Sequence, residues 1–387
     1  MLIIDPPATA GGTDSAQERF RPCGEAIRSM RTKPFFLWLV IAAQLFIYGQ
    51  FWYHADLTTT DFPAFHAVGL LWKSGEQPYN LENQCRVEKE VNPAQPCLPF
   101  AHPPVLLPAL GLVSDANYSA SYWRWTFLTT VILGLCLIPL YLLSRDLRIA
   151  MQSILFFPAV FGLWMGQDNA LVLLAVVLCV YLLTRNRDLL AGIALSLGVV
   201  KPQLVLVLAL PLLFSRFKAF LGFCLGGIVL LIFSLALVGV EGLKGILSLM
   251  GLMSKIQGFG TWPEGMYNLT GILARSGVNQ FWSWPVFVFG IILVCILWNR
   301  KGITPATVSI AVIVSVFTAP HVHLWDLSLL IIVLLTLHPL APAVGSLLII
   351  STFPFGLTYW AAYAMMLVLA ILHFRSLDQP WRPQYGR

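Results

Sequence analysis

Long runs of apolar residues alternate with short polar segments along most of the chain. The first run covers residues 34–53. The others lie at about 125–143, 149–166, 169–184, 189–200, 202–215, 219–239, 279–298, 303–320, 324–338, 340–358 and 361–374. An apolar helix of about 20 residues crosses the hydrocarbon core of a membrane, and somewhat shorter ones often line a cavity. The pattern therefore predicts an all-α polytopic membrane protein with about twelve transmembrane helices.

Two segments allow other counts. Residues 100–113 are apolar but short and contain three prolines, which favours an interfacial or re-entrant segment over a span. Residues 189–215 form either one helix kinked at Lys201-Pro202 or a hairpin of two short helices with Lys201 at its tip.

Charge decides the predicted orientation. Charged residues make up only 11% of the 387 and apolar residues 58%, whereas a soluble domain carries about a quarter charged residues. The net charge is +6, and most of the basic residues between spans fall on one side, which the positive-inside rule makes cytoplasmic. This sorting favours the hairpin and places both termini in the cytoplasm. The chain also has no basic cluster of more than three residues, which excludes nucleic acid as a partner. The residues that sort this way are Arg145, Arg148, Arg185, Arg187, Arg216, Lys218, Arg300, Lys301 and Arg375.

The same scheme divides the chain into three parts. Residues 1–33 are rich in Gly, Pro, Ser and charge and are expected to form a disordered cytoplasmic tail. Residues 34–374 form the membrane domain, and residues 375–387 a second cytoplasmic tail. The polar chemistry gathers on the outer side, in loops at 54–124 and 240–278 and in short turns between spans.

Two cysteines share the first outer loop. Cys85 and Cys97 are a disulfide candidate if that loop faces an oxidising compartment. The four cysteines inside apolar runs are expected to be small core residues.

Asp61 stands at the start of a helix-like stretch and has two interpretations. An aspartate ahead of Pro63 is a normal N-cap for a helix that ends near Gly75. The apolar spacing from Phe65 to Trp72 also suits a helix in the membrane interface, with Asp61 at headgroup level. There the carboxylate could act as a general base toward a hydroxyl.

Other polar residues lie at the predicted outer ends of spans. The turn Gln167-Asp168-Asn169 either caps the next helix or binds a ligand. Lys201 either extends to the surface or supplies a point charge for phosphate.

Two histidines and a carboxylate lie within six residues of one another, where ionisable groups usually have a function. His321, His323 and Asp326 suit phosphate or sugar hydrogen bonding with fewer assumptions than a metal site. In the second outer loop, Glu264 and Arg275 are the charged candidates. The sequence predicts no metal and no cofactor.

Taken in order, these motifs resemble those of the polyprenyl-phosphate-sugar-dependent glycosyltransferases of the GT-C superfamily, of the glycosyltransferase family 87 type. The resemblance is narrowest to bacterial alpha-mannosyltransferases that build phosphatidylinositol mannosides, although "PHVHLWD" stands here where those carry a Trp- and His-rich "SW-x-H-H-W" segment. The matching residues are Asp61-Phe62, Gly75, Pro78-Tyr79, Phe100 to Pro104, Gly166, Gln167, Asn169, Ala191-Gly192, Lys201-Pro202, Asn268, Thr270, Arg275, Pro320-His321 and Asp326-Leu327.

The resemblance implies a GT-C fold with interfacial helices in the first outer loop. It implies transfer of a hexose, mannose in the mannoside-building members, from a polyprenyl-phosphate donor to a lipid or glycan acceptor. Transfer would invert the anomeric carbon on the outer face of the plasma membrane, with Asp61 as base and membrane lipids around the protein. The residues assigned to the donor phosphate and sugar are Lys201, Arg275, His321, His323, Gln167, Asn169, Asn268 and Asp326.

A transporter or a lipid or glycolipid flippase is the alternative. Many transporters carry internal repeats, and none is evident in this chain. The polar groups also gather on one predicted side, which favours an enzyme. An enzyme predicts one outward cavity that opens laterally to lipid, and a transporter predicts a path with two gates.

Overall fold

The computed structural model describes residues 34–53, 56–255, 262–337, 340–352 and 356–377. The tail expected at 1–33 and most of the tail expected at 375–387 lie outside these residues. Every regular element in the described part is a helix, which confirms the all-α prediction.

The helices follow the apolar runs of the sequence. The α-helices are α1 (Pro34–Tyr53), α2 (Phe62–Lys73), α3 (Leu81–Val91), α4 (Leu107–Val113), α5 (Tyr118–Leu135), α6 (Leu137–Ser144), α7 (Leu147–Ile154), α8 (Phe157–Trp164), α9 (Asn169–Thr184), α10 (Asp188–Ser196), α11 (Pro202–Ser215), α12 (Phe217–Lys255), α13 (Leu269–Arg275), α14 (Ser283–Lys301), α15 (Pro305–Thr318), α16 (Ile331–Leu334), α17 (Ala341–Thr352) and α18 (Thr358–Ser376). Short 3-10 helices are η3 (Leu57–Thr59), η4 (Pro104–Leu106), η5 (Leu197–Val200), η6 (Pro263–Gly265), η7 (Gln280–Trp282) and η8 (Leu324–Leu330).

Four described helical segments are long and apolar enough to cross a membrane: Tyr118–Ser144, Phe217–Leu252, Gln280–Lys301 and Thr358–Ser376. A fifth results if α7 and α8, bent by 48° at a short break, form one span. The remaining expected spans coincide with apolar helices of 10–17 residues. At 1.5 Å per residue, a 14-residue helix is only about 21 Å long, shorter than a hydrocarbon core of about 30 Å. The count of twelve spans stays a prediction.

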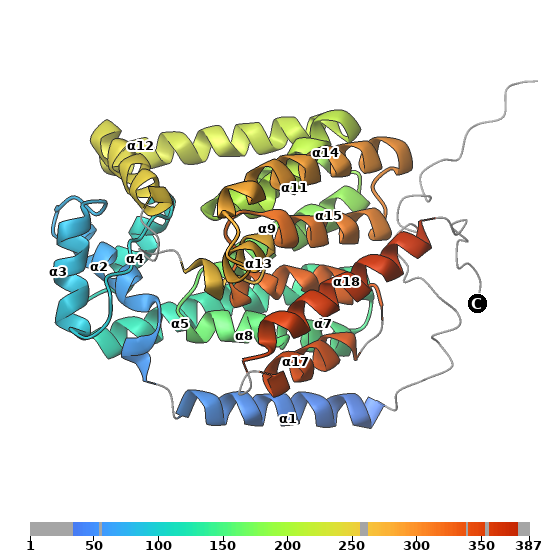
Figure 1. Cartoon of the computed structure of the whole chain (residues 1–387), viewed down its shortest axis with the longest axis horizontal. Coiled ribbons are helices and arrows are strands. Elements are labelled where there is room, and N and C mark those ends of the chain that lie inside the picture. The colour runs from blue at the N-terminus through green and yellow to red at the C-terminus, as the bar shows by residue number, and fades with distance from the viewer. Residues whose placement is uncertain (1–33, 54–55, 256–261, 338–339, 353–355, 378–387) are drawn as a thin grey trace, which may run out of the picture.

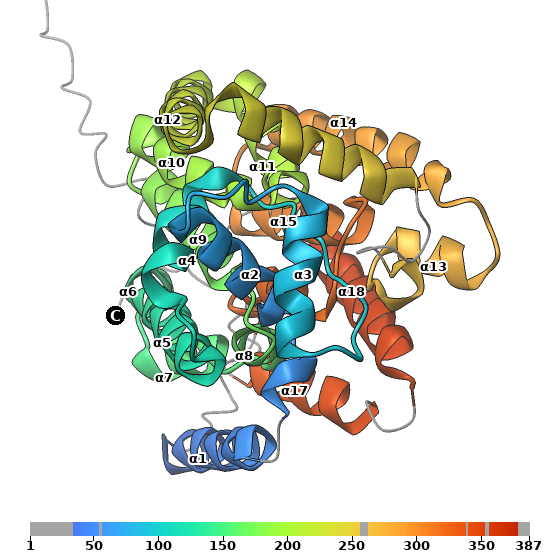
Figure 2. The same ribbon diagram turned by 90° about the vertical axis from the view of Figure 1, so that its left-hand side faces the viewer.

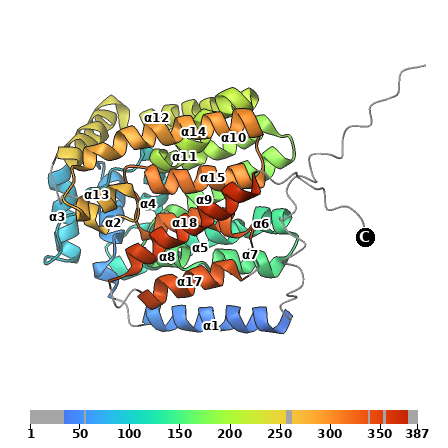
Figure 3. The same cartoon turned by 45° about the vertical axis from the view of Figure 1, so that its right-hand side comes forward.

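The long helices run side by side, and several short helices gather at one end of them. Figure 1 shows α2, α3, α4 and the second part of α12 at this end, which we call the α2–α4 end. Figure 2 looks onto it, and Figure 3 shows α14, α15 and α18 packed alongside one another. The start of α1 and the end of α18 lie at the opposite end (Figure 1).

Glycines bring α10 and α12 into backbone contact. A Cβ on Gly192 would lie 1.8 Å from the carbonyl oxygen of Ala219, and one on Gly226 would lie 2.1 Å from Ser196 Oγ. Contacts farther along α10 are made with residues farther along α12, so the two helices are parallel. Helix α11, which joins them in the sequence, must therefore run in the opposite direction. The segment is therefore the hairpin of two short helices, with Lys201 at its tip.

The long helix α12 bends at Gly239, where the backbone has φ 64°. Beyond the bend it continues to Lys255 and buries Ile246 and Leu249. The expected outer loop 240–278 therefore begins with four turns of helix and also contains α13. A Cβ on Gly245 would lie 3.1 Å from Tyr79 Cβ, so this part of α12 packs over the chain between α2 and α3.

Helix α2 is buried within the protein, which corrects the expectation of a helix lying in the membrane interface. Nine of its twelve residues are buried, among them His66 on the face expected to be polar. Small residues allow this close packing: a Cβ on Gly69 would lie 2.4 Å from Ser114 Oγ, and one on Gly111 would lie 2.5 Å from the Trp72 ring. In segment 100–113, α4 packs on α2 and η4 packs on α12. The helical stretch Pro104–Val113 is only ten residues long, and its interfacial or re-entrant position stays a prediction.

Candidate active site

The side chain of Asp61 is directed away from its own helix. Asp61 is the residue before α2, yet its carboxylate makes no capping hydrogen bond. Instead Oδ2 accepts a hydrogen bond of 2.6 Å from Nε2 of Gln167. The backbone N–H of Asp61 donates to the carbonyl of Met165 at 3.1 Å. An N-cap side chain must accept from the first turn of its helix, so the geometry does not support the capping interpretation.

The tight turn between α8 and α9 brings Gln167 to Asp61. It needs glycine at Gly166, where φ is 72° and a Cβ would lie 2.6 Å from that of Phe62. The indole of Trp125 donates to the Gly166 carbonyl at 2.8 Å. The buried ring of Phe62 thus packs on this turn and fixes the distance between Asp61 and Gln167.

Lys201 is paired with two carboxylates at the tip of the α10–α11 hairpin. Its Nζ lies 2.7 Å from Oδ1 of Asp326 and 3.6 Å from Oδ1 of Asp168. All three side chains are buried. Asp326 Oδ2 also accepts from the backbone N–H of His323 at 2.9 Å. Lys201 therefore does not extend to the surface, and its removal would leave the buried carboxylate of Asp326 without its cation, which is strongly destabilising.

His102 completes this network, although it is not among the site residues predicted from the sequence. Its Nδ1 lies 2.9 Å from Oδ2 of Asp168, and its side chain is 21% exposed. The available signal was a lone histidine beside two prolines in an otherwise apolar outer segment, within the "F-x-x-P-P" motif. Asp168 is thus a partner of His102 and Lys201, and its side chain does not cap α9.

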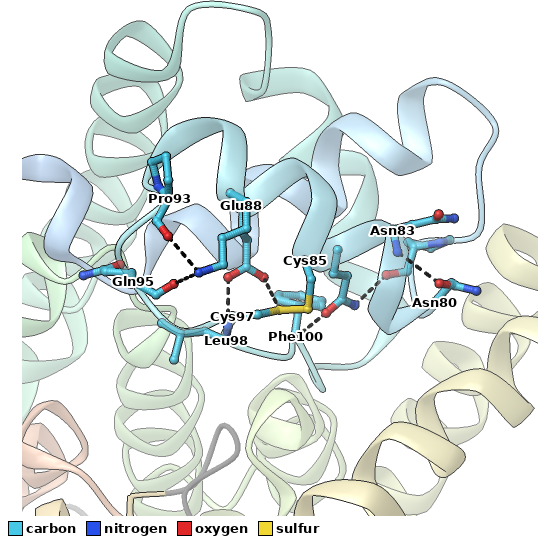
Figure 4. Close-up of a disulfide and its surroundings, with 12 residues drawn as sticks. Asn80, Asn83, Cys85, Glu88, Pro93, Gln95, Cys97, Leu98 and Phe100 are labelled. Atoms are coloured by element: carbon cyan, nitrogen blue, oxygen red, sulfur yellow. Dashed lines mark hydrogen bonds between the residues drawn. A yellow bond between two sulfur atoms is a disulfide. The ribbon is translucent and has the colours of Figure 1, made fainter.

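Helix α3 holds the segment that carries His102. Cys85 on α3 and Cys97 form a disulfide with a Cα–Cα distance of 5.2 Å. Figure 4 shows the carboxylate of Glu88 beside this disulfide, where it accepts from the backbone N–H of Leu98 at 2.8 Å. Gln84 Oε1 accepts from the N–H of Phe100 at 2.9 Å. These contacts fix the chain just before His102.

The site residues act on one another electrostatically. Burial raises the pKa of Asp61 to about 6, although the Gln167 hydrogen bond and the charges of Lys201 and His102 act in the opposite direction. Burial alone would raise the pKa of Asp168, but His102 and Lys201 outweigh it and lower that pKa. Asp61 therefore changes charge near neutral pH, as a general base should, while Asp168 stays ionised.

His321 and His323 lie against each other, with ring centroids 4.6 Å apart. The ring of His323 also contacts Trp325 at 4.8 Å. Burial lowers the pKa of His321 to about 3 and that of His323 to about 4. Both rings are neutral at pH 7, so they offer hydrogen bonds but no charge to a phosphate.

The amide of Asn169 is directed at the segment that carries Asp326. Its Nδ2 donates to the carbonyl of Trp325 and to Ser328 Oγ, both at 3.3 Å. This contact joins the α8–α9 turn to η8, so two separate parts of the site move together.

The side chains of Asn268 and Arg275 are engaged by the protein itself. Asn268 donates to the carbonyl of Ala319 and accepts from the N–H of Gly271 at 3.1 Å. Arg275 donates to the carbonyls of Glu264 and Met266 and to the hydroxyl of Tyr363, and it lies 4.1 Å from the ring centroid of Tyr359. Both residues tie α13 to neighbouring segments. The donor contact that the sequence suggested for them stays a prediction.

The arrangement gathers one carboxylate that titrates near neutral pH, a network of close contacts that joins His102, Asp168, Lys201 and Asp326, and two neutral imidazoles at the α2–α4 end. The sequence profile of glycosyltransferase family 87 matches residues 100–322, which is more than half of the chain. The match includes His102, Lys201 and His321 and begins after Asp61. Comparison with curated proteins and with solved structures gave no match.

Proposed function

Because the chain belongs to glycosyltransferase family 87, we propose that it is a membrane hexosyltransferase whose active site is the cluster around Asp61. The donor is a polyprenyl phosphate that carries one hexose, with mannose the first candidate. The acceptor is a hydroxyl group of a lipid or glycan. The observation that carries the proposal is the Asp61 carboxylate, which is free of a capping role, held by Gln167 and of pKa about 6.

The proposed reaction is a single inverting displacement. The acceptor oxygen attacks the anomeric carbon from the side opposite the phosphate, and Asp61 accepts the hydroxyl proton. The bond between the anomeric carbon and the phosphate oxygen breaks, and its electron pair stays with polyprenyl phosphate. Alignment of the two substrates and stabilisation of the developing charge supply most of the acceleration. The step requires no metal and no cofactor.

The other site residues divide into groups that meet substrate and groups that support them. Gln167 orients Asp61, and the neutral rings of His321 and His323 offer hydrogen bonds to the sugar or phosphate. Lys201, Asp326 and Asn169 hold the α10–α11 tip, the α8–α9 turn and η8 together. Asn268 and Arg275 support the segment that carries His321.

The setting suits a lipid-borne substrate. A hollow between α1 and α8 is lined by Tyr48, Trp52, Phe157, Val160, Phe161 and Trp164. Trp164 directly precedes Met165, whose carbonyl accepts from the Asp61 N–H. The hollow is small and apolar, so part of a prenyl chain could lie against it next to the site. We place the α2–α4 end on the outer face of the plasma membrane, with both termini cytoplasmic, because the basic residues sort to the other side.

The test is transfer by the purified full-length protein. Detergent-solubilised protein is incubated with a panel of polyprenyl-phosphate hexoses and lipid hydroxyl acceptors, and release of polyprenyl phosphate is measured. Asp61→Asn should lower the rate by about 10²–10⁴-fold, because an amide cannot accept the proton. Asp115→Asn is the matched control. Asp115 pairs with Arg124 at the surface, so this variant should keep its rate.

Full activity of Asp61→Asn would overturn the assignment and move the search for a base to Asp168, Glu264 and Asp326. Release by neither the wild type nor the controls with any donor would reject the donor class. A flux of lipid-linked sugar across liposomes without transfer would instead favour a flippase.

A further inference from the structure

The proposed reaction needs positive charge at the leaving phosphate. A sugar-linked phosphodiester carries one negative charge, and breaking its bond to the sugar adds a second. In the described part of the chain, the cations near the site already have partners. Lys201 is paired with Asp326 and Asp168, and Arg275 with two carbonyls and Tyr363. His321 and His323 are neutral at pH 7.

His102 differs from these groups because only one of its two ring nitrogens, Nδ1, has a polar partner among the described residues. Nδ1 faces Asp168 at 2.9 Å, and no hydrogen bond or ion pair of Nε2 is found among the described residues. The ring is 21% exposed, whereas Lys201 and Asp168 are buried. An imidazole held at Nδ1 by a carboxylate has a fixed orientation, and its imidazolium form carries a second N–H, at Nε2. Its Nε2–H is then available to an anionic oxygen.

We propose that His102, oriented by Asp168, binds the phosphate of the lipid donor and supplies the positive charge that Lys201 does not. The inference rests on the proposed function and adds a substrate-contacting residue to it. Lys201 is then a positioning residue, which holds the carboxylates of Asp168 and Asp326 in place.

The surroundings of His102 fix its ring between aromatic groups. Its centroid lies 5.1 Å from that of Phe65 on α2 and 4.9 Å from that of Phe100. The backbone carbonyl of His102 accepts from the hydroxyl of Tyr79 at 2.8 Å. With the Cys85–Cys97 disulfide and Glu88 fixing the preceding residues, the imidazole has little freedom to turn away from Asp168.

The position of His102 also suits the reaction. Its charge lowers the pKa of Asp61, so the two groups lie within electrostatic reach of each other. The charged and titratable groups around it are Asp168 and, beyond it, Lys201 on the α10–α11 tip, Asp61 at the start of α2 and the neutral His321 ring. A phosphate at Nε2 would thus stand near the base without competing for the Gln167–Asp61 hydrogen bond.

The experiment compares His102→Gln with His102→Arg in the full-length protein. The readouts are the KM and kcat for the donor and the inhibition constant of added polyprenyl phosphate. His102→Gln should weaken product inhibition and raise KM at least tenfold, because it keeps an amide donor but loses the charge. His102→Arg should restore much of the inhibition. The control is His373→Gln: this buried histidine in the last turn of α18 hydrogen-bonds Thr336, and the end of α18 lies far from the α2–α4 end, so both constants should stay unchanged.

Unaltered inhibition by polyprenyl phosphate in a folded, active His102→Gln protein would overturn the inference and leave the proposed function intact. A wild-type protein that neither transfers nor is inhibited would reject the proposed function itself. If the variants do not fold, mass spectrometry of wild type treated with diethyl pyrocarbonate decides. Polyprenyl phosphate should protect His102, and full modification under saturating product overturns the assignment.

Discussion

At the scale of single residues, Asp61 has a position that two different roles could explain. An aspartate before a proline-started helix normally caps it, and this is what local sequence predicts. The structure directs the carboxylate toward Gln167, which is 106 positions away in sequence. Only the packing of Phe62 on Gly166 creates this contact, so the function of the side chain depends on tertiary structure that the local pattern does not contain.

The raised pKa of Asp61 predicts how activity depends on pH. Below pH 6 the carboxyl is mostly protonated and cannot accept the hydroxyl proton. We expect kcat/KM to fall about tenfold per pH unit well below pH 6 and to reach a plateau above pH 7. Initial rates between pH 4.5 and 8.5 measure this. A flat profile in this range, with the protein folded throughout, would contradict a base of pKa about 6.

Stability gives an independent check on the same group. The pKa of Asp61 is raised above its ordinary value of 3.8, so the folded state binds its proton more tightly than the unfolded chain does. The ionised carboxylate therefore disfavours folding as pH rises through 6. Asp61→Asn removes this cost, and above pH 6 its melting temperature should equal or exceed that of the wild type. A clear drop in melting temperature would point to a structural role.

The residue assignments made from sequence divide by the kind of contact they need. Gln167, Lys201, His321 and Asp326 were singled out because polar groups are rare in apolar surroundings, and the structure brings Gln167, Lys201 and Asp326 into hydrogen bonds with site carboxylates or their neighbours. The sequence could not indicate that Lys201 pairs with Asp168 and Asp326, because these two residues come from separate turns. Nothing in the apolar, proline-containing segment around His102 indicated that its side chain would contact Asp168.

At the scale of elements, hydrophobic runs predict where helices lie much better than what covers them. Each predicted span coincides with a described helix or a bent pair. The prediction that α2 lies in the membrane interface was wrong, because an apolar face at helical spacing can pack equally well on lipid or on protein. The small residues Ala64, Ala67 and Gly69 were the available sign that other helices approach α2 on several sides.

The contact between α10 and α12 gives a test with an internal control on one helix. A Cβ on Gly222 would lie 2.1 Å from the carbonyl oxygen of Leu189, so the backbones must separate to accept it. Gly222→Ala should destabilise the protein by about 1–3 kcal/mol, the usual cost of overpacking, and move Lys201. Gly227 lies on the same helix with open space at its Cβ position, so Gly227→Ala should be neutral or slightly stabilising.

Thermal unfolding in detergent, followed by tryptophan fluorescence, measures both glycine variants. Activity should fall with Gly222→Ala and stay unchanged with Gly227→Ala. Equal stability of the two variants would mean that α10 and α12 do not approach as closely as the described backbone indicates.

At the scale of the whole molecule, the candidate site, the disulfide and the short helices α2, α3 and α4 share one end. Asp61, the Cys85–Cys97 disulfide and the α8–α9 turn all belong to the α2–α4 end, while α1 begins and α18 ends at the other (Figure 1). Persistent disulfides need an oxidising compartment, and the basic residues of the opposite end favour the cytoplasm. Two independent physical arguments thus predict the same orientation for the catalytic end.

Helix α14 offers the sharpest test of that orientation, because it is one of the four segments that pass as a complete span. Ser276 lies just before it and Arg300 near its end, and both are exposed. In a background with Cys23, Cys224 and Cys295 replaced by serine, Ser276→Cys should react with a membrane-impermeant maleimide in intact cells. Arg300→Cys should react only after the membrane is opened. The reverse pattern would place Asp61 and the donor phosphate on the cytoplasmic side, where the Cys85–Cys97 disulfide would not persist. The proposed transfer would then have to draw on a cytoplasmic sugar donor.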